Sequence, residues 1–171
     1  MAVQKVTVYG AGIAGLVAAI NLANMGFKVE VAEKRDGVGG STTWHPSIHQ
    51  QSFDLNKTSN FIGIDIIPCF HPVKRQVLYI YDRKITLNNL KNNWVCEKGQ
   101  KTTSIENYLY SKARECKIEF KFGEIFDLSQ IRIEKTDEPK CIVATGLEKE
   151  LYAELEIRQV VIKGCRGRQL K

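Results

Sequence analysis

Three glycines near the start of the 171-residue chain have the spacing of a phosphate-binding turn. Gly10, Gly12 and Gly15 lie in the stretch VTVYGAGIAGL, residues 6–16. In a strand–turn–helix unit the first glycine permits a tight turn, the second lets the backbone approach a pyrophosphate, and the third lets the helix pack on the strand. The free N–H groups at the start of such a helix also favour an anion. We therefore predict that a pyrophosphate is bound by Gly10, Gly12, Ile13, Ala14 and Gly15.

The residues around these glycines predict the strand and the helix that must position them. Val3, Val6 and Val8 alternate in a short apolar strand. Gly26 is placed to end the helix that follows the turn. Five apolar residues recur at helical spacing within this helix: Ile13, Leu16, Val17, Ile20 and Ala23.

A second strand places a carboxylate close to this turn. Phe27, Val29 and Val31 alternate, and Glu33 ends the strand. Glu33 follows Gly15 by 18 positions, near the spacing of about 20 expected for an acid that binds ribose hydroxyls. Its charge disfavours a 2′-phosphate, because two negative charges would meet there. This order of elements predicts a nucleotide-binding βαβ unit, and a βαβ unit that binds nothing is the alternative.

The uncharged run from residue 6 to Phe27 could also be a targeting or membrane segment. A signal peptide needs an apolar core with a small-residue cleavage site, and a membrane helix needs about 20 mainly apolar residues. Asn21, Asn24 and the glycines interrupt the run. Neither alternative explains the glycine spacing, so we expect no transmembrane segment.

The stretch EKRDGVGGS, residues 33–41, follows the acid with two basic residues and a second glycine pair. It resembles the N-terminal motif of flavoproteins with two dinucleotide-binding domains, the glutathione-reductase-like FAD superfamily. In that family the segment brings the chain back beside the FAD pyrophosphate, which implies cofactor contacts for Lys34, Arg35, Gly40 and Ser41. A simple NAD domain has no need of the second glycine pair, so the resemblance favours FAD.

A later stretch, KCIVATG at residues 140–146, resembles the second FAD-contact motif of this family. The resemblance implies that Ala144, Thr145 and Gly146 lie beside the nucleotide half of FAD, with Ile125 as a further cofactor contact. It implies an α/β Rossmann-like FAD/NAD(P)-binding fold with a parallel sheet, a β-meander and an inserted antiparallel hairpin. Segments 125–128, 131–133 and 141–143 are the expected meander strands.

The middle of the chain predicts further elements. A helix is expected over TTSIENYLYSKARECK, with Thr103 and Glu106 as a capping box. A strand is expected over residues 118–122. The stretch QVLYIYDRKITL predicts a hairpin with Asp82 and Arg83 near its turn, and FIGIDIIPCFHP predicts a strand ending at Pro68.

The resemblance also bears on domain organisation. We expect residues 1–171 to form a single FAD-binding domain, with 42–101 as an insertion belonging to an incomplete substrate region. The stretch CEKGQKTTSIENYL is similar to geranylgeranyl-reductase-like flavoproteins, with Lys98 where arginine is more usual. The family's third FAD motif is a Gly-Asp pair, which this sequence lacks, and members usually have at least twice this length. The expectation is a truncated flavoprotein whose flavin site is completed by a second chain or a further C-terminal region.

These observations predict the FAD-binding domain of a flavin-dependent oxidoreductase, of the reductase or monooxygenase type, that binds the ADP half of FAD. NAD(P)H is a candidate electron donor, and the small-molecule substrate is not identified. Trp44 and His45 are the better catalytic candidates because they follow the second glycine pair. A non-enzymatic FAD- or nucleotide-binding module is the alternative. The charge of +6 is spread along the chain, so a nucleic-acid partner is not expected.

Five cysteines without paired spacing argue against a disulfide framework and against a metal site. Reduced thiols are typical of cytosolic proteins. We therefore expect a cytoplasmic protein.

Overall fold

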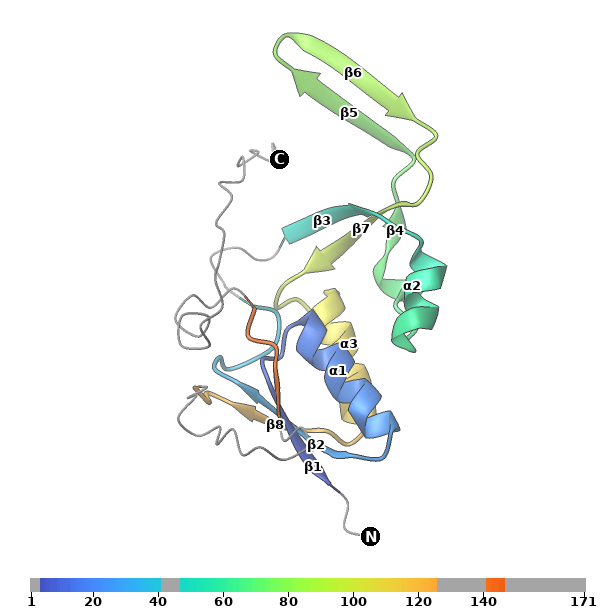
Figure 1. Cartoon of the computed structure of the whole chain (residues 1–171). Coiled ribbons are helices and arrows are strands. Elements are labelled where there is room, and N and C mark those ends of the chain that lie inside the picture. The colour runs from blue at the N-terminus through green and yellow to red at the C-terminus, as the bar shows by residue number, and fades with distance from the viewer. Residues whose placement is uncertain (1–3, 41–46, 126–140, 147–171) are drawn as a thin grey trace, which may run out of the picture.

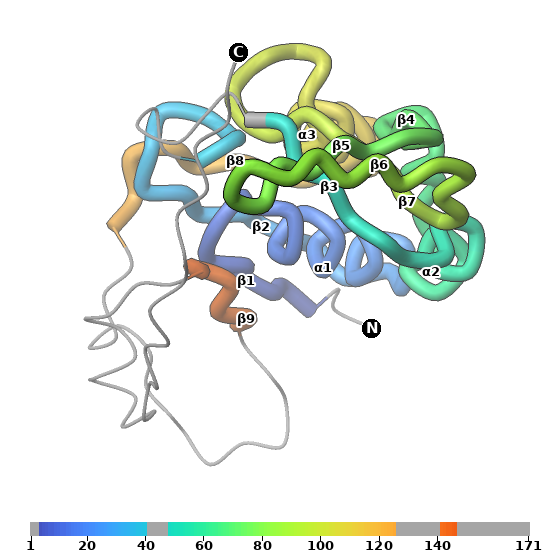
Figure 2. Tube along the Cα trace, turned by 90° about the horizontal axis from the view of Figure 1, so that it is seen from above, coloured from blue at the N-terminus to red at the C-terminus, as the bar shows by residue number. Residues whose placement is uncertain are grey.

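A parallel sheet of four strands forms one part of the protein, of which the computed structural model describes residues 4–40, 47–125 and 141–146 (Figure 1). The strand order is β8-β2-β1-β9. Helices α1 and α3 pack against each other, and α1 also packs on β1 and β2 (Figure 2). The bounds are β1 Lys5–Tyr9, α1 Ile13–Asn24, β2 Lys28–Glu33, α3 Ile105–Glu115, β8 Glu119–Phe122 and β9 Cys141–Val143. This arrangement confirms the predicted Rossmann-like α/β fold.

Helix α1 buries the apolar stripe that its spacing predicts. Leu16 and Ile20 are buried, while Ile13, Val17 and Ala23 are half-buried against the same core. Across from the helix, the core includes fully buried valines of β1 and β2, Val8 and Val31. The helix ends at Asn24, Met25 is its C-cap, and Gly26 follows with φ of +91°. A left-handed residue is a common helix stop, which is why glycine suits this position.

Helix α3 begins one residue later than the predicted capping box. Its N-cap is Ser104, whose hydroxyl accepts a hydrogen bond from the N–H of Asn107 at 3.2 Å. Thr103 donates instead to Glu97, and the carboxylate of Glu106 accepts from the N–H of Gly99. The capping box of Thr103 and Glu106 was therefore wrong, because Thr103 binds Glu97 of the preceding strand and Glu106 binds the loop between that strand and the helix.

Between β2 and α3 the chain forms an antiparallel region (Figure 1). Three strands pair in the order β3-β7-β4, and β5 and β6 form a separate hairpin. The predicted hairpin is confirmed, with Tyr81 and Asp82 at its turn. The bounds are β3 Ser47–Ser52, α2 Leu55–Ile62, the 3₁₀ turn η1 Ile67–Cys69, β4 His71–Pro72, β5 Arg75–Ile80, β6 Arg83–Asn88 and β7 Asn93–Lys98.

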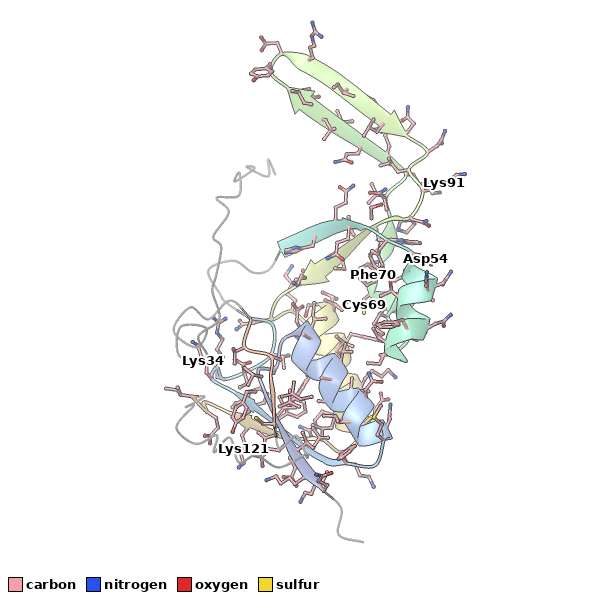
Figure 3. The ribbon with its side chains drawn as sticks, viewed as in Figure 1. Lys34, Asp54, Cys69, Phe70, Lys91 and Lys121 are labelled. Carbon is pink, nitrogen blue, oxygen red and sulfur yellow. The ribbon has the colours of Figure 1, made fainter. Side chains whose placement is uncertain are left out.

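The strand predicted to end at Pro68 is wrong. Its first two residues, Phe61 and Ile62, are the end of helix α2 (Leu55–Ile62), which Asp54 caps by accepting a hydrogen bond from the N–H of Lys57 at 2.9 Å. Gly63 ends this helix with φ of +66°, and the short 3₁₀ turn follows. Cys69 and Phe70, which are buried, lie beside α2 (Figure 3). The apolar run was misread because its buried isoleucines, Ile64 and Ile66, come from a turn rather than from a strand.

The predicted meander is only partly within the described residues. Its segments at 126–128 and 131–133 lie outside them. Cys141–Val143 was expected in this antiparallel meander, but these residues form β9, which pairs in parallel with β1. That pairing places the ATG residues directly after the strand that lies beside β1 at the edge of the described sheet. Among the described residues, no helix is long and apolar enough to cross a membrane.

Candidate nucleotide-binding site

Two glycines of the turn between β1 and α1, Gly10 and Gly15, are required by backbone packing within the protein. Gly10 has φ of +103°, and its N–H donates to the carbonyl of Ala32 at 2.8 Å. A Cβ atom at this position would lie 2.5 Å from the carbonyl oxygen of Ala144. A Cβ atom on Gly15 would collide with the carbonyl oxygen of Gly10. Both glycines therefore let the turn, the helix and the ATG segment approach one another.

Gly12 is different, because nothing in the described part of the chain explains the missing side chain. Its φ of −78° and ψ of 178° are ordinary extended values, and a Cβ atom there would meet no atom of the described residues within 4 Å. Gly12 is the N-cap of α1, which has no side-chain cap and no acidic residue in its first turn. An uncompensated helix N-terminus beside open space fits an anionic group whose approach requires a bare backbone.

Glu33 lies beside this turn, as its place at the end of β2 predicts. One carboxylate oxygen accepts from the N–H of Ala11 at 2.7 Å, and the other accepts from the N–H of Arg35 at 3.1 Å. Strands β1 and β2 are parallel neighbours, so their carboxyl ends meet at one edge of the sheet. Ligands of open α/β sheets bind outside this edge. The bond to Ala11 was not predicted, since no sequence pattern marks a backbone donor.

The other two strands of the sheet bring their following residues to the same edge. The N–H of Gly123 donates to the carbonyl of Arg35, and the N–H of Glu124 donates to the carbonyl of Glu33, both at 3.0 Å. Ile125, which comes next, is 78% exposed. On the opposite side of β1, the N–H of Ala144 donates to the carbonyl of Tyr9 at 2.7 Å.

The structure therefore gathers most of the predicted site residues at one sheet edge. Those gathered here are Gly10, Gly12, Ile13, Ala14, Gly15, Glu33, Lys34, Arg35, Ile125, Ala144, Thr145 and Gly146. The side chain of Ile13 packs against the core, so only its backbone is available to a ligand at this edge.

Arg35 contributes an unpaired polar atom to this edge. Its Nη1 is buried and has no hydrogen-bond partner among the described residues. A buried guanidinium nitrogen without a partner is costly, so an anionic or polar ligand would relieve this atom. Lys34, the neighbouring basic residue, is exposed (Figure 3). Gly12 and Arg35 are therefore both suited to a phosphate-containing group.

The second glycine pair has a structural reason that the sequence did not reveal. Gly39 is buried with φ of +98°, and a Cβ atom on it would collide with the carbonyl oxygen of Gly99 in the loop after β7. Gly40 follows with φ of +73° and is exposed. Gly39 thus serves a contact between two loops, while Gly40 is open to a ligand. Ser41, Trp44 and His45 lie outside the described residues.

Within the described part of the chain, the structure offers little support for metal or thiol chemistry. No three His, Cys, Asp or Glu side chains in this part are grouped as a metal site. Burial raises the pKa of Cys69 to about 12, and it also raises the pKa of Cys96 and Cys141. These thiols stay protonated near neutral pH and are therefore poor nucleophiles. The four described cysteines are unpaired.

Comparison with known proteins bears on the same residues. Residues 8–63 match the model of the NAD(P)-binding Rossmann-like domain family. A 37-residue segment is 60% identical to 4,4′-diapolycopene oxygenase of Methylomonas sp, covering 22% of this chain and 7% of that enzyme. A 42-residue segment is 52% identical to the flavin-dependent L-tryptophan oxidase RebO of Lentzea aerocolonigenes, covering 25% of this chain and 9% of the oxidase.

A solved structure shares the fold. A variant of 2-methyl-3-hydroxypyridine-5-carboxylic acid oxygenase superposes with a TM-score of 0.56 at 15% identity, over 71% of this chain and 32% of that one. The matched parts span less than a tenth of either curated relative and about a third of this neighbour. The chain therefore has a Rossmann-like α/β fold, and short segments of it are similar to segments of oxidoreductases.

Proposed function

We propose that the chain binds the ADP half of FAD as the FAD-binding part of a flavin-dependent oxidoreductase. The observation that carries the proposal is Gly12, where neither the backbone angles nor packing against the described residues requires glycine. Arg35, whose Nη1 has no partner among the described residues, and Glu33 both lie at the carboxyl end of β2 and carry opposite charges. The relationship to a flavin-dependent oxidase agrees with FAD as the cofactor.

The residues of the proposed site contact different parts of the nucleotide. The N–H groups at the start of α1 and the bare backbone of Gly12 hold the pyrophosphate, and Glu33 accepts hydrogen bonds from the adenosine ribose. The remaining contacts with the nucleotide half of FAD come from Gly40, Ser41 and the residues Ala144–Gly146. FAD itself would supply the redox chemistry, and the chain's part is to bind and orient it. The reductase or monooxygenase type and the geranylgeranyl-reductase-like subgroup within the glutathione-reductase-like superfamily rest on the sequence motifs alone.

The proposal extends to organisation and location. We propose that residues 1–171 form one FAD-binding domain with 42–101 as an insertion, and that further protein, from a second chain or a longer one, completes the flavin site. NAD(P)H is the proposed electron donor. A cytoplasmic location rests on five cysteines without paired spacing. The direct test is the absorption spectrum of the purified protein and the identity of any nucleotide released on denaturation. A colourless protein that binds neither FAD nor ADP would contradict the proposal.

Glu33→Ala is expected to weaken binding of both ADP and FAD by about tenfold to a hundredfold, because hydrogen bonds to a charged group contribute roughly 1.5–3 kcal/mol. Calorimetric titration measures the change. Glu119→Ala is the matched control, since it removes an exposed carboxylate of the same sheet that pairs with Lys28 at 3.3 Å. Equal affinities for the native protein and Glu33→Ala would show that the carboxylate does not face the ribose.

The 171-residue chain is expected to bind FAD about as tightly as ADP, because every described residue in the proposal contacts the nucleotide half. Small-molecule sites usually bury most of their ligand, so the flavin ring should stay open to solvent here. Titration with both ligands tests the affinities, and iodide quenching of flavin fluorescence tests the exposure. Much tighter binding of FAD with a shielded ring would mean that this chain builds the flavin pocket itself.

A further inference from the structure

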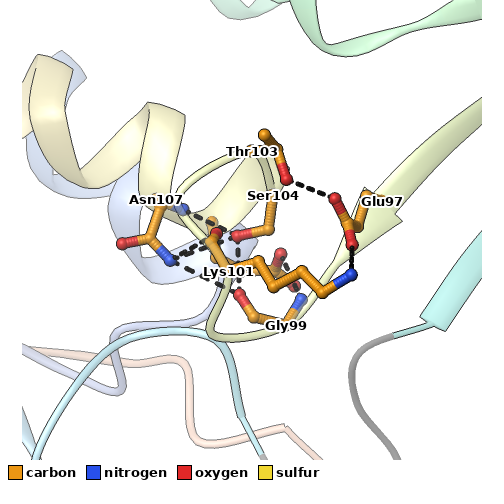
Figure 4. A network of polar contacts seen from close by, with 7 residues as sticks. Glu97, Gly99, Lys101, Thr103, Ser104 and Asn107 are labelled. Carbon is orange, nitrogen blue, oxygen red and sulfur yellow. Dashed lines mark hydrogen bonds and ion pairs between the residues drawn. The ribbon is translucent and has the colours of Figure 1, made fainter.

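Gly99, the residue directly after β7, is held on both sides by buried groups from the start of α3 (Figure 4). Its N–H donates to Oε2 of Glu106 at 3.1 Å, and its carbonyl accepts from Oγ of Ser104 at 2.6 Å. Ser104 is 0% exposed and Glu106 is 4% exposed. A buried carboxylate is costly unless it is hydrogen-bonded, so the bond to Gly99 is a strong local constraint. The φ of Gly99, +126°, also requires glycine.

A second set of contacts fixes the rest of this loop from its solvent side (Figure 4). Glu97 forms an ion pair with Lys101 at 2.9 Å and accepts a hydrogen bond from Thr103. The amide of Asn107 donates to the carbonyl of Lys101 at 3.0 Å. The loop over residues 98–104 is therefore braced on both sides, which exceeds what a plain connection between a strand and a helix needs.

The braced loop is in contact with the turn that contains Gly39 and Gly40. A Cβ atom on Gly39 would collide with the carbonyl oxygen of Gly99 and would lie 2.8 Å from the backbone nitrogen of Gln100. The two backbones are thus in direct contact, and the position of Gly99 decides where Gly39 can lie. Gly40 is the next residue in the chain and is exposed, so its position follows from the same contact.

We propose that Glu106 and Ser104 are positioning residues of the nucleotide site. They fix the Gly99 peptide, the Gly99 peptide fixes Gly39, and Gly39 places Gly40 for contact with the pyrophosphate of the bound dinucleotide. The inference rests on the proposed function, since it takes Gly40 as part of the FAD site. Neither side chain acts on the ligand itself. Because Gly99 directly follows β7, its contact with Gly39 also links the insertion to nucleotide binding.

The first test compares two substitutions of Glu106 in the full chain. Glu106→Leu removes the acceptor for the Gly99 N–H, and we expect affinity for both ADP and FAD to fall by about tenfold, the scale of one charge-assisted hydrogen bond. Glu106→Gln keeps an acceptor oxygen and should restore most of the affinity. Titration calorimetry gives the affinities, and thermal melting is measured in parallel. Affinity that follows melting temperature, without rescue by glutamine, would contradict a positioning role.

A second pair of variants keeps the inference testable if Glu106→Leu does not fold. Gly39→Ala introduces a collision with Gly99 and a strained φ of +98°, whereas Gly26→Ala introduces a similar strain at +91° with no described residue within 4 Å of the new Cβ atom. Both should lower stability, but only Gly39→Ala should lower nucleotide affinity, again by about tenfold. Equal affinity of the two variants would overturn the positioning role. If the native chain binds neither ADP nor FAD, the proposed function fails and the inference falls with it.

Discussion

Gly12→Val is expected to abolish measurable binding of ADP and FAD while leaving the fold intact. The β1–α1 turn accepts a side chain at this position without strain, because φ is −78° and a Cβ atom would meet no described residue within 4 Å. The same side chain would occupy the space in front of the helix N-terminus that we assign to the pyrophosphate. We expect a loss of about a hundredfold or more in affinity, equal to roughly 2.7 kcal/mol.

Gly12→Ala and Gly12→Val together form a size series for this experiment. Affinity for ADP should fall from glycine to alanine to valine, whereas circular dichroism and melting temperature should change little. ADP is the more informative ligand because it lacks the flavin and reports on the nucleotide half alone. Native-like affinity in Gly12→Val would remove the pyrophosphate from this turn and with it the main support for the proposed function.

The parts of the fold that could be predicted are those whose pattern is local. The helical stripe of α1 is confirmed because the helix presents these residues to one core, and the hairpin is confirmed because two extended runs flank a two-residue turn. The stretch FIGIDIIPCFHP failed because a buried turn also collects apolar residues, and Gly63 marks a helix end within it. The N-cap of α3 was displaced because Thr103 and Ser104 are both capping types, and only the loop's contact with Glu97 decides between them.

The nucleotide site likewise has residues that a local pattern could predict and residues whose role depends on a distant contact. Gly10, Gly12 and Gly15 could be placed because each follows from its distance to one strand end and one helix start. The role of Gly39 could not, since its partner Gly99 lies 60 positions later in the chain and the contact is between two backbones. No residue type or spacing records such a contact. The burial of Glu106 is equally hidden, because an acid in the first turn of a helix is ordinarily a solvent-exposed complement to the helix dipole.

Gly15→Ala is expected to have the opposite effect to substitution of Gly12, although the two residues share one turn. The added Cβ atom would collide with the carbonyl oxygen of Gly10, which is backbone and cannot rotate away. Gly10 is itself held by its hydrogen bond to Ala32 and by its close approach to Ala144. Helix α1 would therefore have to move away from β1, and α1 also packs against α3.

Overpacking of this kind costs typically 1–3 kcal/mol and sometimes more, and we expect Gly15→Ala to lie at about 3 kcal/mol. For a chain of this size that corresponds to a melting temperature lower by roughly 6–12 °C. Gly37→Ala is the matched control, because a Cβ atom at Gly37 meets no atom of the described residues within 4 Å and needs no left-handed backbone. It should leave stability unchanged or raise it by about 0.4–1 kcal/mol. If thermal melting shows Gly15→Ala to be as stable as the native chain, α1 does not pack on the turn as closely as the structure has it.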